Sequence, residues 1–145
     1  MTSCRITFSP FCQLRVNDFM ENLTPQNFNQ QLRERTLDFA ASVRDLFTTK
    51  RISILDRSMV MQMMRRSSSV AANFRAAARS RSDAEFYAKI CIVTEEIDET
   101  QHWLEYLQRI HVLTTEESSR VRSESDELVR IFSSIKKKMK DRLGK

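Results

Sequence analysis

Arginine and lysine side chains give this sequence its clearest chemical potential, because they gather in two segments. Residues 57–82 contain six arginines and no acidic residue, and residues 129–145 contain seven Lys or Arg against one Asp. Cations grouped in this way can neutralise nucleic-acid phosphates, with an affinity that falls as salt rises. The candidate nucleic-acid-binding residues are Arg65, Arg66, Arg75, Arg79, Arg81, Lys136, Lys137, Lys138 and Lys140.

Spacing along a helix decides how these cations can act together. One helix face is expected to hold, roughly, Arg65, Arg75 and Arg79. The second and third of these follow Arg65 by 10 and 14 residues. The basic C-terminal segment has a second interpretation as a solvated helix end, where the macrodipole favours cations. It has no interleaved aromatic residues on which bases could stack. Both interpretations stay open.

A metal or catalytic site is not predicted. Glu99 and His102 form one E-x-x-H motif, whereas di-iron bundles use two such motifs and two further glutamates. His111 has no Glu three residues before it. The three cysteines lack the C-x-x-C spacing of zinc sites: Cys4, Cys12 and Cys91. We therefore expect a non-enzymatic protein without a cofactor.

Four polar or aromatic residues are expected to be structural or to lie at an interface. Asn73 stands in an apolar, small-residue stretch, where an unpaired buried amide would cost about 1–3 kcal/mol. We expect it to hydrogen-bond across the protein to Glu96 or Glu99. Trp103 is expected in the core or in a contact between subunits, and Cys91 as a small buried hydrophobe.

The near-absence of glycine and proline determines the fold class. The chain has one Gly and two Pro in 145 residues, and neither type occurs between Gln26 and Leu143. Phosphate-binding loops and tight hairpins need positive φ angles, which glycine adopts most easily. A P-loop, a Rossmann fingerprint and a hairpin-rich β fold are therefore excluded. An all-α fold remains, with turns made from polar residues.

Apolar residues recur every three or four positions and predict helices over about 25–49, 54–79, 83–111 and 115–141. Thr24 is the expected N-cap of the first helix, with Pro25 at its first position. Ser82 with Glu85, and Thr114 with Glu117, have the spacing of capping boxes. Four amphipathic helices with short links predict an antiparallel up-down-up-down four-helix bundle over residues 25–142, followed by a basic end at 143–145.

The second predicted helix is basic and the third is acidic. Residues 83–105 contain seven Asp or Glu and one Lys. These charges can match across the seam between the two helices, or equally between subunits. Each exposed pair would contribute only about 0–1 kcal/mol, so the match selects partners more than it stabilises.

The N-terminal 24 residues differ from the rest, because they show no helical period. We expect an irregular or disordered extension, or for residues 1–19 a segment before the true start at Met20. No 18-residue apolar run and no signal peptide are present. We expect no membrane contact and a cytoplasmic location in a bacterium-like cell.

Residues 62–107 resemble the 23S rRNA-intervening-sequence proteins, also called four-helix bundle proteins. The positions that carry the resemblance are Gln62, Met63, Met64, Arg65, Ser67 to Ser69, Ala72, Asn73, Ser82, Glu85, Phe86, Glu96, Glu99, Trp103 and Leu104. The chain departs from the family at two places. Ala76 stands where an acidic residue is usual, and Ala77 or Ala78 stands where many members have Gly.

The resemblance implies a left-handed four-helix bundle assembled as a homopentamer, with no established catalytic activity. Some distant relatives are accessory factors of reverse transcriptases in diversity-generating retroelements, where a basic pentamer binds the polymerase and nucleic acid. We therefore expect an oligomeric accessory protein that binds structured RNA or DNA through its second helix and C-terminus. A reverse transcriptase or another protein is a further expected partner. The alternative is a structural or regulatory adaptor between proteins, with no nucleic-acid role.

Overall fold

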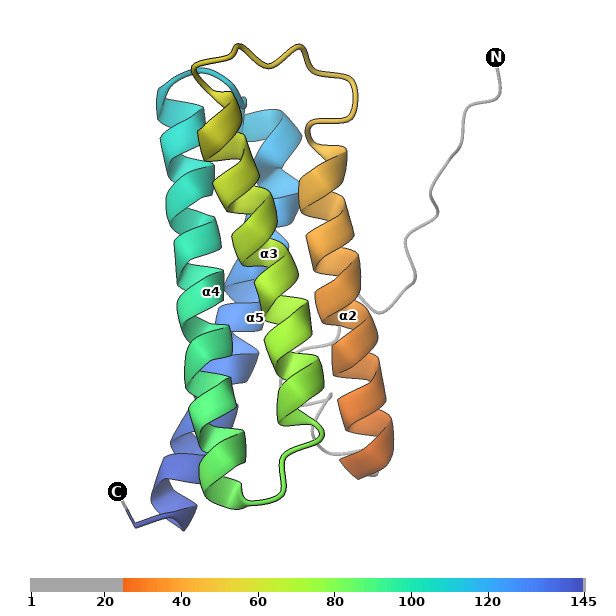
Figure 1. Cartoon of the computed structure of the whole chain (residues 1–145), viewed down its shortest axis with the longest axis vertical. Coiled ribbons are helices and arrows are strands. Elements are labelled where there is room, and N and C mark those ends of the chain that lie inside the picture. Colours follow the sequence, from red (N-terminus) through yellow and green to blue (C-terminus); the bar gives the residue numbers. More distant parts are fainter. Residues whose placement is uncertain (1–24, 145) are drawn as a thin grey trace.

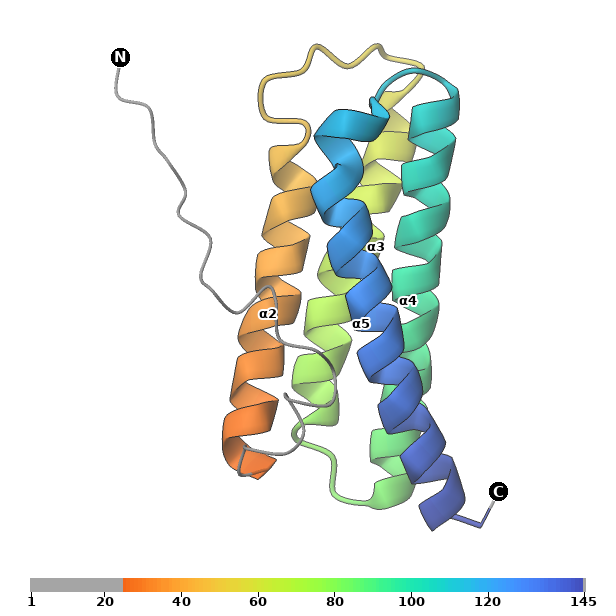
Figure 2. The same cartoon turned by 180° about the vertical axis from the view of Figure 1, so that it is seen from behind.

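Four helices pack side by side as a bundle in the computed structural model, which describes residues 25–144 (Figure 1). They are α2 (Pro25–Asp45), α3 (Arg57–Ala77), α4 (Asp83–Arg109) and α5 (Thr115–Arg142). No strand occurs within the described residues. Successive helices run in opposite directions, and the view from behind places α5 between α2 and α4 (Figure 2). Contact is most extensive between α3 and α4, and that between α2 and α5 is much smaller. The predicted all-helical fold is confirmed.

The core is filled by one apolar stripe from each helix. Its members recur every three or four residues, which is the spacing of one face of an α-helix. Phe74 of α3 and Phe132 of α5 meet in the centre with ring centroids 5.3 Å apart and planes inclined at 67°. The fully buried large side chains include Leu32, Phe39, Met63, Phe74, Ile90, Ile97, Leu104, Leu107, Leu128 and Phe132.

Five hydroxyl residues are buried in this apolar core: Thr36, Ser67, Thr100, Ser118 and Ser125. Each donates a hydrogen bond to a backbone carbonyl three or four residues earlier in its own helix. A buried donor without a partner would cost about 1–3 kcal/mol. Because each hydroxyl is satisfied locally, the core holds these polar groups without needing another helix to accept their protons.

Two glutamines fix how α4 lies against α5. Gln101 Nε2 donates to Ser125 Oγ at 3.0 Å, and Gln108 Nε2 donates to Ser118 Oγ at 2.7 Å. The two donors are seven residues apart on α4, and the two acceptors are seven residues apart on α5. In an antiparallel pair this arrangement places the same contact twice, two turns apart, along one seam.

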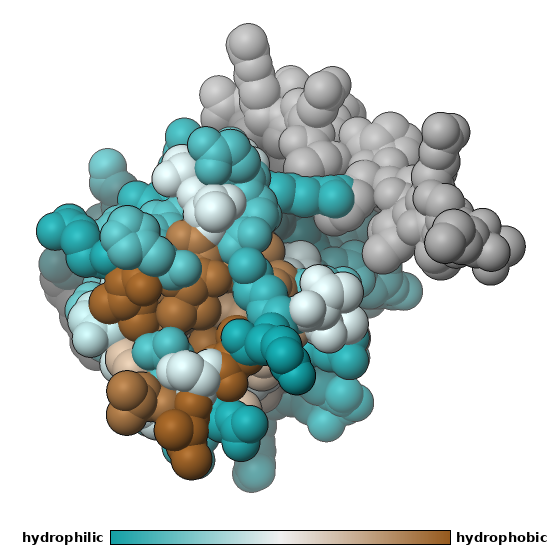
Figure 3. Space-filling model, turned by 90° about the horizontal axis from the view of Figure 1, so that it is seen from above, coloured by the Kyte–Doolittle hydropathy of each residue, from teal (hydrophilic) through white to brown (hydrophobic). Residues whose placement is uncertain are grey.

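The link between α2 and α3 is longer than the sequence ranges indicated. Helix α2 ends at Asp45, where the spacing predicted a helix to about residue 49, and a hydrogen-bonded turn follows. Phe47 is buried and anchors this turn, while Ile54 and Leu55 are 81% and 79% exposed. The view onto this end of the bundle shows apolar surface gathered there (Figure 3). The link therefore presents apolar side chains to solvent.

Side-chain caps begin α4 and α5. Ser82 Oγ accepts from the backbone N–H of Glu85 at 3.1 Å, but the Glu85 carboxylate accepts from the N–H of Arg81, one residue before the predicted Ser82. At α5 the box is complete, because Thr114 and Glu117 each accept from the backbone N–H of the other. The position of Thr24, the N-cap predicted for the first helix, lies outside the described residues.

Glu117 also joins α5 to the link, because its carboxylate lies 2.8 Å from Lys50 Nζ. The hydrogen bonds from Lys50 and from the Thr114 N–H lower the pKa of Glu117. An unfolded glutamate titrates near about pH 4.3. Since the folded pKa is lower, this stabilisation is complete above the unfolded pKa and is lost as pH falls through the folded pKa.

We therefore predict that Glu117→Gln has a lower free energy of unfolding than the parent at neutral pH. This difference in free energy should shrink as pH falls from about 5 to about 3. Urea denaturation at a series of pH values measures both free energies of unfolding. Glu116→Gln serves as the control, because it removes a carboxylate without a side-chain partner in residues 25–144. It should lower the free energy of unfolding at neutral pH by less than Glu117→Gln does. An equal gap for Glu117→Gln at pH 7 and pH 3 would contradict the assignment.

The turn from α4 to α5 uses a histidine where glycine is usual. His111 has φ = 62°, the left-handed region, and no other non-glycine residue in 25–144 has a positive φ. The Val112 N–H bonds to the Leu107 carbonyl at 2.9 Å, and the His111 N–H bonds to the Gln108 carbonyl at 3.1 Å. These bonds form a Schellman motif, which ends many helices with Gly at this position.

Replacing His111 by glycine should raise the free energy of unfolding by about 0.5–1 kcal/mol. Glycine removes the strain of the left-handed conformation, which exceeds the entropy that glycine adds to the unfolded chain. Chemical denaturation followed by circular dichroism measures the change. His111→Ala keeps the strain and should be no more stable than the parent, so stabilisation by alanine would show that strain is not the cause.

None of the helices between residues 25 and 144 is both long and apolar enough to span a bilayer. The extension expected over residues 1–24 and the end of the basic tail at Lys145 lie outside the described residues.

Candidate nucleic-acid interface

Helix α3 presents a band of exposed residues to solvent, which includes Arg65 and Arg75. Arg79 is exposed too but follows the helix, which ends at Ala77 and not at residue 79 as the spacing predicted. The positions between them carry short side chains: Ser68, Ala72 and Ala76. We call this band, continued by Arg79, the arginine stripe. The opposite face of α3 holds Met63, Val70 and Phe74 in the core, so packing fixes the direction in which the stripe points.

The arginines of the stripe have no ion-pair partner in the part of the chain that the structure describes. Within residues 25–144, no acidic side chain lies within 4 Å of the charged groups of Arg65, Arg75 or Arg79. The sequence explains this locally, because residues 57–82 contain no Asp or Glu. Three exposed positive charges thus stand without local neutralisation.

Arg66 differs from the other candidates because it faces α4. Its Nε lies 2.7 Å from Glu99 Oε2 and its Nη1 lies 3.3 Å from Glu96 Oε2. Its side chain is 36% exposed, and that of Glu96 is 14% exposed. The expected match between a basic and an acidic helix therefore occurs within the chain at this one arginine of α3, which leaves Arg66 neutralised and the stripe free.

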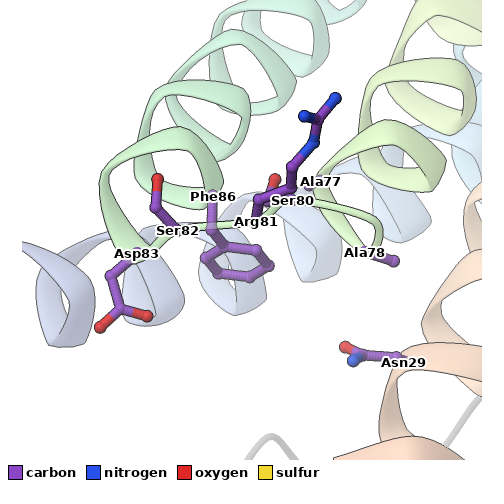
Figure 4. Close-up of a pocket in the computed structure, with 8 residues that line it drawn as sticks. All are labelled: Asn29, Ala77, Ala78, Ser80, Arg81, Ser82, Asp83 and Phe86. Carbon is purple, nitrogen blue, oxygen red and sulfur yellow. The ribbon is translucent and has the colours of Figure 1, made fainter.

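Arg81 lies in the turn between α3 and α4, beside a hollow of about 240 Å³ (Figure 4). The hollow is lined by Asn29, Ala77, Ala78, Ser80, Arg81, Ser82, Asp83 and Phe86. Ser80 Oγ is buried without a hydrogen-bond partner within residues 25–144. In the close-up the Arg81 side chain points away from Asn29, on the far side of the hollow. Arg81 is exposed, and it lies in the turn rather than on the exposed face of α3.

The lysines of α5 gather at the same end of the bundle as Arg79. Helices α3 and α5 run in the same direction, so their basic C-terminal ends lie at one end of the molecule (Figure 1). Lys137, Lys138 and Lys140 are exposed, and Lys136 is half-buried. Arg142 differs, because its Nε lies 2.8 Å from Asp83 Oδ2 at the start of α4. The sequence did not indicate that the two basic segments share one end.

The expectation for Asn73 was wrong. Its Nδ2 donates to the Ser69 carbonyl at 3.0 Å and lies 3.4 Å from Ser69 Oγ, one turn earlier in the same helix. Glu96 and Glu99, the expected partners, are held by Arg66 instead. An amide can bond to its own helix whenever position i−4 is within reach, and this local bond takes the place of a cross-helix bond.

Aromatic side chains cluster near the other end of α4. Trp103 packs against the core and stands edge to face with His102 and Tyr106, at centroid distances of 5.2 and 5.9 Å. Tyr106 is 41% exposed. The cluster lies on α4, not on the arginine stripe, so it offers no stacking surface beside the unpaired arginines.

Glu99 and His102, the E-x-x-H pair, do not form the beginning of a metal site. The Glu99 carboxylate is engaged by Arg66. No group of three or more His, Cys, Asp or Glu suited to a metal occurs between Pro25 and Gly144. Cys91 is partly buried, and its hydrogen bond with Tyr87 raises the pKa of the Tyr87 phenol.

Comparison with known proteins identifies a protein family for this chain. Residues 29–134 match the family model for the 23S rRNA-intervening sequence protein, which is well over half of the sequence. The chain belongs to this family. The 23S rRNA-intervening sequence match includes the whole arginine stripe but ends at Ser134, before Lys136. The lysines of α5 are therefore outside the part of the chain that carries the family relationship.

A solved structure supports the same assignment. The chain is similar to a protein of unknown function from the S23 ribosomal protein family of Bacteroides thetaiotaomicron, with 29% identity and a TM-score of 0.65. The similarity covers 73% of this chain and 98% of that one. No curated protein matches the sequence. The family assignment thus rests on the 23S rRNA-intervening sequence match and on a structural neighbour whose own function is unknown.

Proposed function

We propose that this 23S rRNA-intervening sequence protein is a non-enzymatic accessory protein that binds nucleic acid through the arginine stripe of α3. The observation that supports the proposal is a set of exposed arginines without an ion-pair partner among residues 25–144: Arg65 and Arg75 on α3, and Arg79 just after it. Guanidinium groups form paired, planar hydrogen bonds with phosphate oxygens. Exposed cations without local acidic partners are available for this contact.

The lysines of α5 supply a second, more mobile set of positive charges at the same end. Lys137, Lys138 and Lys140 carry long flexible side chains, each a point charge rather than a planar fork. We assign them a supporting role, because a helix C-terminus favours cations for its own stability. The same preference applies to Arg75, in the last turn of α3, whereas Arg65 lies away from the helix C-terminus.

Fluorescence anisotropy with labelled RNA and DNA hairpins tests the function across a salt series. Binding should be measurable at about 50 mM salt and weaken steeply toward about 200 mM. Arg65→Ala/Arg75→Ala/Arg79→Ala should reduce the affinity at least tenfold. The matched control is Arg44→Ala/Arg109→Ala/Arg130→Ala, which removes the same charge from other exposed positions and should have a smaller effect.

Two results would overturn this function. Absence of binding at about 50 mM salt, where phosphate contacts are strongest, would exclude a nucleic-acid role. Equal loss in the two triple variants would show that net charge acts rather than the stripe. Circular dichroism on both variants establishes that each one is folded.

An adaptor between proteins is the second candidate, and the exposed apolar link favours it. Ile54 and Leu55 of the link are more exposed than Met61 of α3 and Tyr106 of α4. Apolar surface gathers at this end of the bundle (Figure 3). Apolar side chains gathered on a surface are typical of protein contacts. Pull-down with Ile54→Ser/Leu55→Ser against the parent tests it, and unchanged capture of every partner would contradict it.

Self-association is part of the proposed function, on the strength of the family resemblance to homopentamers. Light scattering with size exclusion measures the mass in solution. A mass five times that of the 17.1 kDa chain is expected, and a monomer would remove the pentamer from the proposal. Arg66, Glu96 and Glu99 bind each other within one chain, so they are not needed between copies.

A further inference from the structure

The arginine stripe has the shape of a stiff, narrow ridge. On α3 it extends about 15 Å along the helix axis from Arg65 to Arg75, and Arg79 continues it into the turn that follows. Between the arginines, Ser68, Ala72 and Ala76 carry shorter side chains than arginine. The buried side of α3 packs on α4 and α2, so the backbone of Arg65 and Arg75 is held on a straight support. A ligand must meet this row as it stands.

Single-stranded nucleic acid is usually held by aromatic side chains on which its bases stack, together with cations that follow its backbone. The stripe has no aromatic residue. Among the described residues the exposed large apolar side chains are Leu37, Ile54, Leu55, Met61 and Tyr106. Tyr106 lies on α4, close to the helix end opposite that of Arg79. Stacking therefore cannot contribute where the unpaired charge is.

The acidic face of α4 limits the width of any contact. Glu95 is exposed on α4 one turn before Glu99, and the Glu99 carboxylate meets Arg66 of α3. A flexible strand that spread sideways from the stripe would approach these carboxylates and be repelled. A ligand that keeps to the line of the ridge avoids them. Arg66, which is neutralised by Glu99, lies between the arginine stripe of α3 and the acidic face of α4.

A double helix holds its phosphates in a fixed line before it binds, with one phosphate per strand about every 3.4 Å along the axis. Arginines carried on a helix and phosphates held in a duplex lose less conformational freedom on meeting than the same groups on two flexible chains. A single strand must be straightened to match the same row, without stacking energy to offset the loss.

Building on the proposed function, we infer that the arginine stripe binds the phosphodiester backbone of double-helical nucleic acid in preference to a single strand. The chemistry it recognises is shared by RNA and DNA duplexes. The ligand class is thus defined by a rigid double helix, with RNA and DNA as separate arms of the test.

Competition anisotropy separates the possibilities. The probes are an RNA duplex and a DNA duplex of about 20 base pairs, and oligo-U and oligo-dT strands of matching charge, at about 50–200 mM salt. We expect at least one duplex to bind at least tenfold more tightly than its single strand. In Arg65→Ala/Arg75→Ala/Arg79→Ala, the slope of log K against log salt for the duplex should become shallower by about 2.7, which is about 0.9 per arginine.

Each outcome decides a different claim. Equal or tighter binding of oligo-U or oligo-dT, still weakened by the triple variant, overturns the duplex preference and leaves the proposed function in place. Binding to none of the four probes overturns the proposed function itself. If the triple variant still prefers the duplex, the arginine stripe is not the cause of the preference. The Arg44→Ala/Arg109→Ala/Arg130→Ala control should keep the preference and most of the slope.

Discussion

Replacing Phe74 by alanine should lower the free energy of unfolding by about 3–5 kcal/mol, the largest loss expected from a single substitution in this chain. The Phe74 ring is fully buried and stands edge to face with Phe132. The pair joins α3 to α5, two helices whose other contacts are few. Truncation removes the buried apolar surface, leaves a cavity and ends the aromatic contact.

Urea denaturation followed by circular dichroism measures this loss. Leu37→Ala is the matched control, because Leu37 is large and apolar but 63% exposed, and its loss should stay within about 0.5 kcal/mol. A decrease below about 1 kcal/mol for Phe74→Ala would show that the two rings are not the centre of the core.

Removing the carboxylate of Glu124 should cost about 1.5–3 kcal/mol, the second largest effect. Arg35 of α2 donates to both oxygens of Glu124 on α5, with Nη2 and Oε2 3.0 Å apart. The two side chains are 18% and 17% exposed, so water screens this pair less than a surface pair. The pair joins α2 to α5, whose contact is much less extensive than that of α3 with α4.

Glu124→Ala and Glu124→Gln together test the reason for this loss. Glutamine keeps the shape of the side chain but not its charge, so it should recover part of the stability. Asp38→Ala removes an exposed carboxylate of α2 as the control and should change the free energy of unfolding by less than about 0.5 kcal/mol. Added salt should only slightly reduce the stability difference between the parent and Glu124→Ala. If high salt abolishes this difference, the ion pair is an ordinary surface pair.

The architecture could be predicted from sequence because it depends on local spacing. Leu32, Phe39 and Val43 recur on one face of α2, and the same period continues through α3, α4 and α5. The Thr114 box was predicted for the same reason, since both of its bonds join residues three apart. The end of α2 was less well predicted, because the buried Phe47 continues the apolar pattern after the helix has ended.

Side-chain partners across helices could not be predicted in the same way. Periodicity assigns a residue to a face but does not give the rotation and register of the neighbouring helix. Arg66 and Arg65 are adjacent in sequence, yet one binds Glu96 and Glu99 and the other stays exposed. Asn73 had a bonding partner in its own helix, which the composition of the surrounding stretch concealed.

The candidate interface was predicted in its residues and not in its arrangement. Arg75 and Arg79 were named from their charge and spacing, whereas their place at one end with Lys137 and Lys138 depends on the direction of two helices that are not sequence neighbours. Ser68 and Ala72 were named only as positions of the family resemblance, although their short side chains leave the neighbouring arginines projecting from α3.

The paired glutamine contacts between α4 and α5 have a mechanical consequence. If α4 moved one turn, about 5.4 Å, along α5, Gln101 and Gln108 would both lose their serine acceptors in the same step. Intermediate positions would break both bonds and restore neither, so the pair has one rest position and resists gliding. Sliding of α4 against α5 therefore costs both hydrogen bonds at once, whereas a tilt that keeps the register leaves them in place.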